Sequence, residues 1–274
     1  MTVAHRTSTR NPYLLDATRL CVIAALVLAV IGVEACKGKA PLADDQVTSA
    51  LRNDAKPEAI KAALADLRAR AAQDKSLETW APELVRLSKH PDVTIRHSVA
   101  DVMGDDPGRK EFRAALHEML DRDTPLVCNA AAVSLAAFDD GYGHEVLASM
   151  LKPVVLTAPR PGHVRSLAAN GSKVEHGDAV IRLESSGQQT EVLATVSGKV
   201  RLEVETGDIV SGGSRLAVLQ PSAEQMVTAL KALQKVGKSQ DVLYVAEVES
   251  DPVLPSDIRE QAKLAHQRII ERTK

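Results

Sequence analysis

The hydrophobic positions of this chain change their period twice along its length. From about residue 55 to 153, and again from 221 to 274, apolar residues recur every three to four positions, which is the period of an amphipathic helix. Between these stretches, residues 154–219 carry short β-branched runs separated by glycines, a pattern typical of short strands joined by tight turns. The pattern therefore predicts a β module that interrupts a set of helices.

The β segment contains one motif written twice. Seven positions recur 36 residues later without a gap: Ala158, Gly162, Val164, Gly171, Val174, Gly177 and Leu183 are followed by Ala194, Gly198, Val200, Gly207, Val210, Gly213 and Leu219. A single offset held through seven positions indicates an internal duplication. Two related halves of this size can close into a small β-sandwich.

The helical stretches also repeat. A first helix is expected from about Pro57 to Ala72, and a last pair over about 239–249 and 256–272. Asp92 and Asp123 lie 31 residues apart, each at the start of a helix. An aspartate at such a turn can cap the next helix by accepting hydrogen bonds from free N–H groups. These features predict paired helices in series.

The helix pairs resemble HEAT repeats, particularly the short bacterial kind. The resemblance rests on the aspartate at the turn and on Ile95-Arg96 at the start of the second helix, and it covers 55–153 and 222–272. Asp257-Ile258-Arg259 is similar, whereas Leu126-Val127 lacks the arginine. The resemblance implies an α-solenoid, and solenoids present long concave surfaces that bind other proteins.

Removing residues 154–220 restores the helical register. His144 to Leu151 predicts the first helix of a pair, but no second helix follows it directly. After the excision, apolar residues of the next segment match those of the preceding pair: Met226, Ala229, Leu233 and Val236 correspond to Cys128, Ala131, Leu135 and Phe138. We therefore expect the β module to be inserted in the turn between two helices of one pair, where the chain ends lie close together.

The N-terminus predicts an export signal or membrane anchor. The uncharged apolar run Leu20 to Val33 has 14 residues, fewer than the ~20 needed to span a bilayer. Val33-Glu34-Ala35-Cys36 then resembles the lipobox of bacterial lipoproteins, although Glu34 replaces a small residue. The resemblance makes Cys36 the candidate lipid-attachment site. An uncleaved signal anchor and a buried helix of a soluble domain are the alternatives.

The predicted fold is a multi-domain α and β protein, a HEAT-like α-solenoid interrupted by a small all-β domain. Its expected parts are an export signal or anchor (1–36), a polar linker (37–54), helical repeats (55–153), the β insert (154–220) and resumed helical repeats (221–274). In the lipoprotein and signal-anchor cases, the chain beyond the anchor lies on the periplasmic side of the cell envelope.

The insert resembles the biotinyl/lipoyl-type barrel-sandwich hybrid. Ala158-Pro159 with Gly162, then Gly171-x-x-Val174-x-x-Gly177-Asp178, and the same layout in the second half carry the resemblance. Carrier domains of this kind place a modified lysine in the hairpin between the halves, in a pattern like Glu-Ala-Met-Lys-Met-x-x-x-Ile-x-Ala.

In the equivalent run, Glu184 to Ala194, Gly187 takes the lysine's place, so no amide to biotin or lipoate can form there. Lys173 and Lys199 lie in strand and turn segments and do not substitute for it. A plain two-residue turn on Ser186-Gly187 is expected instead. Periplasmic adaptor proteins use the unmodified hybrid as a contact surface, but they normally carry a long coiled-coil hairpin where this chain has a short turn.

Composition and charge favour neither nucleic-acid binding nor a disulfide or zinc framework. The formal net charge is −2, aromatic residues make up 2% of the chain, and residues 153–220 contain seven Lys/Arg against seven Asp/Glu with no aromatic residue. Cys21, Cys36 and Cys128 form no CxxC motif. No nucleic-acid partner is therefore expected.

The candidate chemistry is sparse. His117-Glu118 and His144-Glu145 each lack the second histidine of HExxH. His90 and His97 are expected to be solvated or capping residues. Cys128, on an apolar helical face, is expected to be a structural thiol, and residues 139–143 to be a turn between repeats. We expect no catalytic residues, no cofactor and no metal site, so the chain is interpreted as a non-enzyme.

These features together predict a membrane-tethered, non-catalytic scaffold of the bacterial cell envelope. It would bind protein partners on its solenoid or hybrid surface, for example as an accessory component of a transport or secretion assembly. The alternatives are a carrier-like domain partner of an enzyme complex and a purely structural envelope lipoprotein.

Overall fold

The computed structural model describes residues 41–52, 55–73 and 75–274. The apolar run Leu20 to Val33 and the candidate lipid-attachment site Cys36 lie outside the described residues, so both stay predictions. Among the described helices, none combines the length and the hydropathy that a membrane span requires.

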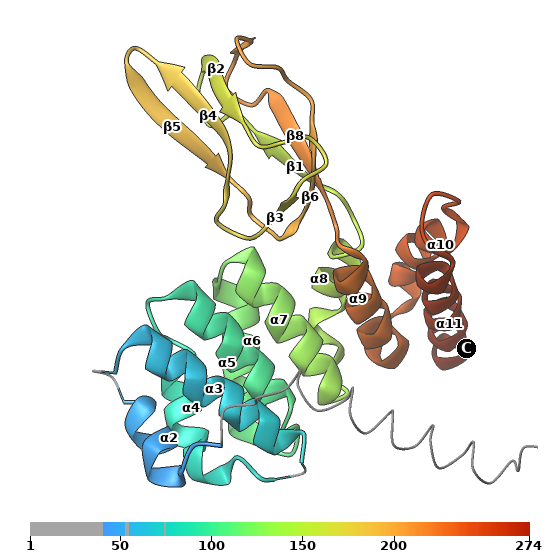
Figure 1. Cartoon of the computed structure of the whole chain (residues 1–274). Helices are drawn as coiled ribbons and strands as arrows, with labels where there is room; N and C mark the ends of the chain where they lie inside the picture. The colour runs from blue at the N-terminus through green and yellow to red at the C-terminus, as the bar shows by residue number, and fades with distance from the viewer. Residues whose placement is uncertain (1–40, 53–54, 74) are drawn as a thin grey trace, which may run out of the picture. The chain divides into compact units, whose positions relative to one another are not determined.

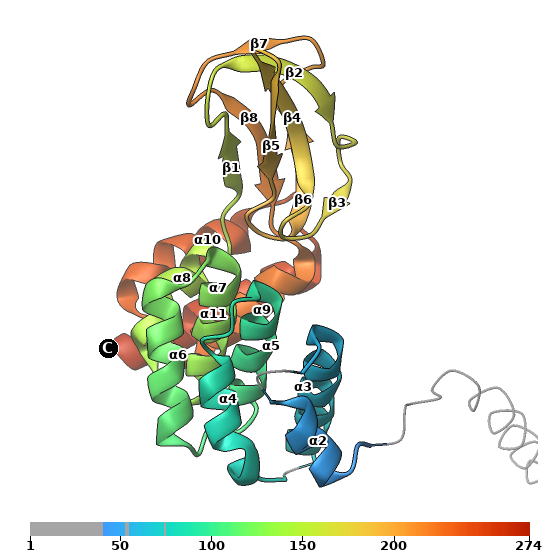
Figure 2. The same ribbon diagram turned by 90° about the vertical axis from the view of Figure 1, so that its left-hand side faces the viewer.

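Helices before and after the β module pack in pairs (Figures 1 and 2). They are α2 (Asp44–Ala50), α3 (Pro57–Ala71), α4 (Ala81–Leu87), α5 (Val93–Gly104), α6 (Lys110–Arg122), α7 (Pro125–Ala137), α8 (His144–Ser149), α9 (Ala223–Val236), α10 (Val242–Ser250) and α11 (Ser256–Thr273), with short 3-10 turns η1 (Glu78–Trp80), η2 (Gly141–Gly143) and η3 (Ser239–Asp241). Helices α4 and α5, α6 and α7, α8 and α9, and α10 and α11 contact each other within pairs. Helices α3, α5, α7, α9 and α11 contact each other in series.

Small side chains let these helices approach closely. A Cβ added to Gly104 at the end of α5 would lie 2.4 Å from the Oγ of Ser134 in α7. The Ser134 hydroxyl donates to the carbonyl of Ala100 at 2.8 Å, so this buried polar group is satisfied where the two helices meet. The paired helices predicted from the sequence are confirmed, whereas their assignment to a HEAT solenoid stays a prediction.

The predicted linker at residues 37–54 is wrong in part, because α2 is a helix that packs on α3. Val47 and Leu51 are fully buried in the same apolar cluster as the helices that follow. Arg70 of α3 secures the segment by an ion pair to Asp44 at 2.6 Å. A single apolar pair four residues apart in a polar stretch was too short a pattern to predict this helix.

The two aspartates at the repeated turns behave differently. Asp92 caps α5, since its carboxylate accepts from the backbone N–H of Thr94 at 2.8 Å. The same prediction for Asp123 is wrong, because Thr124 is the N-cap of α7. Both carboxylate oxygens of Asp123 are instead bound by the guanidinium of Arg96, at 2.6 and 2.7 Å. Asp123 Oδ1 also accepts from the backbone N–H of Thr124 at 2.7 Å, so this carboxylate links Arg96 to the residue that caps α7.

The two helices that flank the β module pack against each other although the module separates them in sequence. Leu147 and Leu151 on one side share an apolar cluster with Met226, Leu230 and Leu233 of α9 on the other. This is the contact expected for an insertion between two helices of one pair.

The β module is a sandwich of two four-stranded antiparallel sheets (Figure 2). Its strands are β1 (Val154–Thr157), β2 (Gly162–Leu167), β3 (Lys173–Val174), β4 (Ala179–Ser185), β5 (Gln188–Leu193), β6 (Gly198–Leu202), β7 (Ile209–Val210) and β8 (Arg215–Gln220). One sheet has the order β1-β8-β6-β3 and the other β5-β4-β2-β7. The expected barrel-sandwich hybrid is corrected on one point, because the sheets do not close into a barrel.

The duplication in the sequence is a pseudo-twofold symmetry of the sandwich. Adding 36 to the residue numbers of β1, β2, β3 and β4 gives the positions of β5, β6, β7 and β8. Exchanging these two sets of strands converts each sheet order into the other. Backbone hydrogen bonds are exchanged in the same way, since Gly171 donates to Val200 at 2.7 Å and Gly207 donates to Val164 at 2.9 Å. Each sheet thus contains strands of both halves, so neither half can complete a sheet alone.

This symmetry explains where the module joins the helices. The turn between β4 and β5 would have its counterpart between β8 and β1, and it is there that the chain arrives from α8 and leaves to α9. Val154 and Leu219 are paired in the sheet, so the entry and exit points are neighbours. The insertion therefore replaces one of two equivalent hairpins and leaves the other free.

Candidate functional site

The free hairpin between β4 and β5 is the first candidate site, because carrier domains are modified at this position. Ser185 pairs with Gln188, which leaves a two-residue turn. Ser186 has φ 51° and Gly187 has φ 76°, the left-handed conformation that a type I′ turn requires at both positions. The predicted Ser186-Gly187 turn is confirmed, and Figure 1 shows it at the end of the module opposite the residues that join the helices.

The turn offers no amine for acylation. Both turn residues are exposed, and a Cβ added to Gly187 would meet no atom within 4 Å. The space that a lysine side chain would need is therefore open, but the residue is glycine. The neighbouring groups are the hydroxyl of Ser186 and the amide of Gln188, whose oxygen accepts from Arg160 at 3.1 Å.

Ion pairs cross the outer face of the sheet that carries this hairpin. Arg165 donates to Glu184 at 2.7 Å and Arg182 donates to Glu191 at 2.8 Å. The hydrogen bond from Arg165 lowers the pKa of Glu184 and outweighs the opposing effect of desolvation. Each of these arginines therefore has a carboxylate partner on a neighbouring strand.

The other sheet presents a basic outer face, defined here by Lys173, Lys199, Arg201 and Arg215 together with Glu203. Lys173 on β3 lies directly opposite Lys199 on β6, and both are exposed. Arg201 and Arg215 share Glu203, at 3.2 and 2.9 Å. Within the described part of the chain, neither lysine has an ion-pair partner. Glu175, two residues after Lys173, accepts from the hydroxyl of Ser197 at 2.6 Å, so the two lysines are left without a carboxylate in ion-pair range among the residues described.

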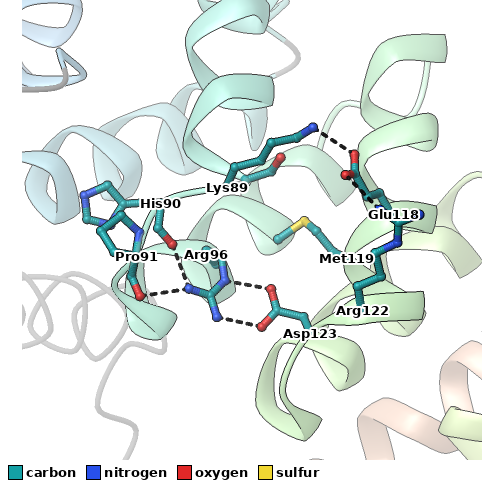
Figure 3. Close-up of a pocket in the computed structure, with 9 residues that line it drawn as sticks. Lys89, His90, Pro91, Arg96, Glu118, Met119, Arg122 and Asp123 are labelled. Atoms are coloured by element: carbon teal, nitrogen blue, oxygen red, sulfur yellow. Dashed lines mark hydrogen bonds and ion pairs between the residues drawn. The ribbon is translucent and has the colours of Figure 1, made fainter.

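A small polar pocket lies among the helices, with a volume of about 310 Å³ (Figure 3). The Arg96–Asp123 pair lines it, and Arg96 also donates to the carbonyls of His90 and Pro91, at 2.7 and 3.0 Å. Burial opposes ionisation of Asp123, but the hydrogen bonds from Arg96 and the backbone of Thr124 lower its pKa overall. Arg96 therefore joins one inter-helix turn to the next, and this arginine is occupied by structural contacts.

A second set of ion pairs also lines the pocket. Lys89 lies 3.1 Å from Glu118, and Arg122 lies 3.9 Å from the same carboxylate. Figure 3 shows Lys89 and Arg122 reaching Glu118 from opposite sides. Among the described residues, no group of three or more His, Cys, Asp or Glu side chains is placed to hold a metal ion.

Two buried carboxylates hold histidines. His144 donates from Nδ1 to Asp241, 3.0 Å from each oxygen, and only 6% and 1% of the two side chains are exposed. His117 lies 2.8 Å from Asp140, which also accepts from Arg113. The first pair joins α8 to η3, so it fastens the helices on the two sides of the insert.

The remaining sequence predictions have clear outcomes. His90 is a capping residue, because its Nδ1 accepts from the backbone N–H of Asp92 at 3.0 Å. Cys128 donates to backbone carbonyls, and burial raises the pKa of its thiol, which suits a structural role. Residues 139–143 form the expected turn, with Asp140 accepting from the N–H of Tyr142.

Sequence reasoning missed the Arg96–Asp123 and His144–Asp241 pairs and the basic face. The turn aspartate recurs at Asp92 and Asp123, but the arginine does not recur at Val127, so the sequence contained only a weak signal for the Arg96–Asp123 pair. The pairing of His144 with Asp241 had no such signal, because 97 residues separate the two. The position of Lys173 opposite Lys199 follows from strand register, which the sequence did not fix in advance.

The comparison with known families identifies the β module. Residues 153–219 match the family described as "Biotin-requiring enzyme". These residues therefore form a biotinyl/lipoyl-type domain, as the resemblance predicted. No curated protein matches this chain.

Similar solved structures include two carboxylases. One is a single-chain, multi-domain long-chain acyl-CoA carboxylase, 17% identical with a TM-score of 0.24, and the other is the urea carboxylase of Kluyveromyces lactis, 26% identical with a TM-score of 0.24. The matches cover 39% and 40% of this chain but only 10% of each solved chain. Similarity at this TM-score does not bear on the fold or the activity of this chain.

Proposed function

We propose that this chain is a protein-binding partner of an enzyme complex, to which it contributes a carrier-like domain that is not itself modified. The observation that carries the proposal is Gly187, which stands in the free hairpin of a biotinyl/lipoyl-type domain at the position of the lysine. The β framework around this position is complete, whereas the one group that makes such a domain a carrier is missing. What remains is a rigid module with a surface for protein contacts.

The helices suit the same role. Paired helices in series form extended surfaces, and a HEAT-like arrangement would let them bind a partner while they hold the β module. Interfaces of this kind need no catalytic residues of their own. The proposal therefore assigns binding to both parts of the chain and chemistry to the partner.

The direct test is peptide mapping by mass spectrometry after coexpression of the full chain with a biotin ligase and a lipoate ligase. The native hairpin should remain unmodified. A graft of Ser185→Ala, Ser186→Met, Gly187→Lys and Gln188→Met restores the Glu-Ala-Met-Lys-Met pattern, and it should be acylated at position 187. The same graft with Gly187→Arg is the matched control, since it adds the charge without an acylatable amine.

Two outcomes would overturn the proposal. Acylation of the native chain would show that the module is a carrier after all. A folded lysine graft that neither ligase modifies would show that the hairpin no longer resembles a carrier in the feature that ligases recognise.

The envelope scaffold favoured by the sequence is a second candidate, and the motif ending in Cys36 is what favours it. In that case a lipid on Cys36 would tether the binding surfaces to a membrane outside the cytoplasm. Labelling with a radioactive fatty acid tests this, because the native chain should incorporate the label and Cys36→Ser should not. Equal labelling of both chains, or of neither, would contradict a lipid anchor at this cysteine.

A further inference from the structure

The two lysines at the centre of the basic face are placed unfavourably for folding. Directly opposed residues of an antiparallel pair hold their Cβ atoms about 5 Å apart, and like charges at such positions destabilise a sheet. Lys173 and Lys199 occupy one such pair, and within the described residues no carboxylate lies within ion-pair distance of either. The sheet therefore carries a repulsive pair on an exposed surface.

The fold itself does not require this pair. Under the pseudo-twofold symmetry, the counterparts of Lys173 and Lys199 are Ile209 and His163, which face each other in the second sheet. The same backbone thus accommodates an apolar residue and a histidine at the equivalent positions. The rest of the second outer face is neutral, because Arg165 and Arg182 are paired with carboxylates.

Protection of a sheet edge explains only one of the two lysines. Lysine on an edge strand prevents pairing with strands of other molecules, and β3 is an edge strand. Strand β6, which carries Lys199, lies inside the sheet between β8 and β3. The equivalent edge strand β7 carries Ile209, which is 78% exposed, so the fold tolerates an edge without lysine.

We infer that the basic face, centred on the opposed Lys173 and Lys199, is a docking surface for an acidic segment of a protein partner. A carboxylate between the two ammonium groups would relieve their repulsion and gain two charge-assisted hydrogen bonds. Complementary charge of this kind sets the choice and the orientation of a partner. The inference rests on the proposed protein-binding function and names the partner's chemistry.

Charge count and composition favour a protein over other polyanions. Basic segments that bind anionic membranes carry clusters of roughly four to eight Lys/Arg residues. Here only two lysines are unpaired, since Arg201 and Arg215 already share Glu203. Proteins that bind single-stranded nucleic acid stack bases on aromatic side chains, and residues 153–220 contain none.

The test measures binding of a fluorescein-labelled peptide of alternating glutamate and serine to the full chain by anisotropy, at low salt. Lys173→Ile with Lys199→His removes the basic pair and installs the residues that the fold already accepts in the other sheet. This variant should weaken peptide binding by about fivefold or more, as expected for loss of two charge contacts. Amide chemical-shift changes in the native chain should centre on residues 173–174 and 198–201.

Arg165→Gln with Arg182→Gln is the matched control, since it removes the same number of positive charges from the opposite face. It should change peptide affinity less than about twofold, because those arginines already have partners.

Equal losses of affinity in both variants, chemical-shift changes centred elsewhere or no peptide binding would overturn the inference. Tighter binding of phosphatidylserine vesicles or of a single-stranded oligonucleotide to the same face would also overturn it. None of these outcomes depends on whether the hairpin is acylated, so the inference and the proposed function fail separately.

Discussion

The two sheets of the β module have symmetry-related strand orders and pair their strands alike, except for a register shift between Val164 and Ser166 that the second half lacks, yet their outer faces differ in charge. The sheet β5-β4-β2-β7 pairs its arginines with carboxylates, whereas the sheet β1-β8-β6-β3 pairs Arg201 and Arg215 with Glu203 and leaves Lys173 and Lys199 without an ion-pair partner among the described residues. Because symmetry-related positions place the same demands on the backbone, the features that both sheets share report on folding. The features that differ report on what each surface contacts.

The largest expected effect concerns a feature that both sheets share. A Cβ at Gly198 would lie 2.5 Å from the carbonyl oxygen of Gln220, and a Cβ at its counterpart Gly162 would lie 2.9 Å from that of Glu184. Gly198→Ala should therefore lower the free energy of unfolding by about 2 to 3 kcal/mol, and Gly162→Ala by about 1 to 2 kcal/mol, because backbone must move in each case. Urea denaturation measures both.

Gly212→Ala serves as the control for this comparison. Its added Cβ would lie 3.7 Å from the nearest atoms, which is an ordinary contact, so the change should stay within about 0.5 kcal/mol. A large loss at Gly212, or no loss at either paired glycine, would contradict the symmetric packing of the sheets.

A smaller effect is expected where the two sheets differ. Lys173→Glu replaces a repulsive pair by an attractive one with Lys199, and it should stabilise the module by about 0.5 kcal/mol. Ile209→Glu, at the symmetry-related position, faces His163 instead of a lysine and should give a smaller gain. Thermal denaturation of both variants tests whether the lysine pair costs stability, and a loss in Lys173→Glu would contradict it.

The smallest effect is a dependence on pH. The pKa of Glu184 is lowered below its ordinary value of 4.5, chiefly by the hydrogen bond from Arg165. The stability that this pair adds is therefore present above pH 4.5 and is lost as the pH falls through the lowered pKa. A carboxyl NMR titration should show this pKa returning toward 4.5 in Arg165→Gln, and an unchanged titration would show that the pair is not formed.

The parts of the fold that repeat in sequence were predictable from sequence. The duplication offset anticipated the pseudo-twofold sandwich, and excision of the insert anticipated the packing of α8 against α9. The turn on Ser186-Gly187 followed from a small residue pair flanked by strand-forming residues. In each case a local pattern and a periodic pattern agreed.

The parts that were missed depend on contacts between distant segments. Helix α2 has one buried residue, Val47, followed by the buried Leu51 at its C-cap, and its burial depends on α3. Asp123 is bound by Arg96, 27 residues earlier in the chain, and Thr124 rather than Asp123 is the N-cap of α7. The module contains equal numbers of basic and acidic residues, so its composition did not reveal that the two outer faces differ in charge. That difference depends on strand register, about which composition carries no information.

The central claim is that this chain keeps the β framework of a carrier domain but lacks the lysine that would carry biotin or lipoate. The measurement that tests it most directly is the mass of the peptide containing Gly187, taken from the full chain after coexpression with both ligases. The account predicts the unmodified mass for the native hairpin and an acylated peptide for the lysine graft. A biotinyl or lipoyl group on the native chain, at any residue of 153–219, would contradict it.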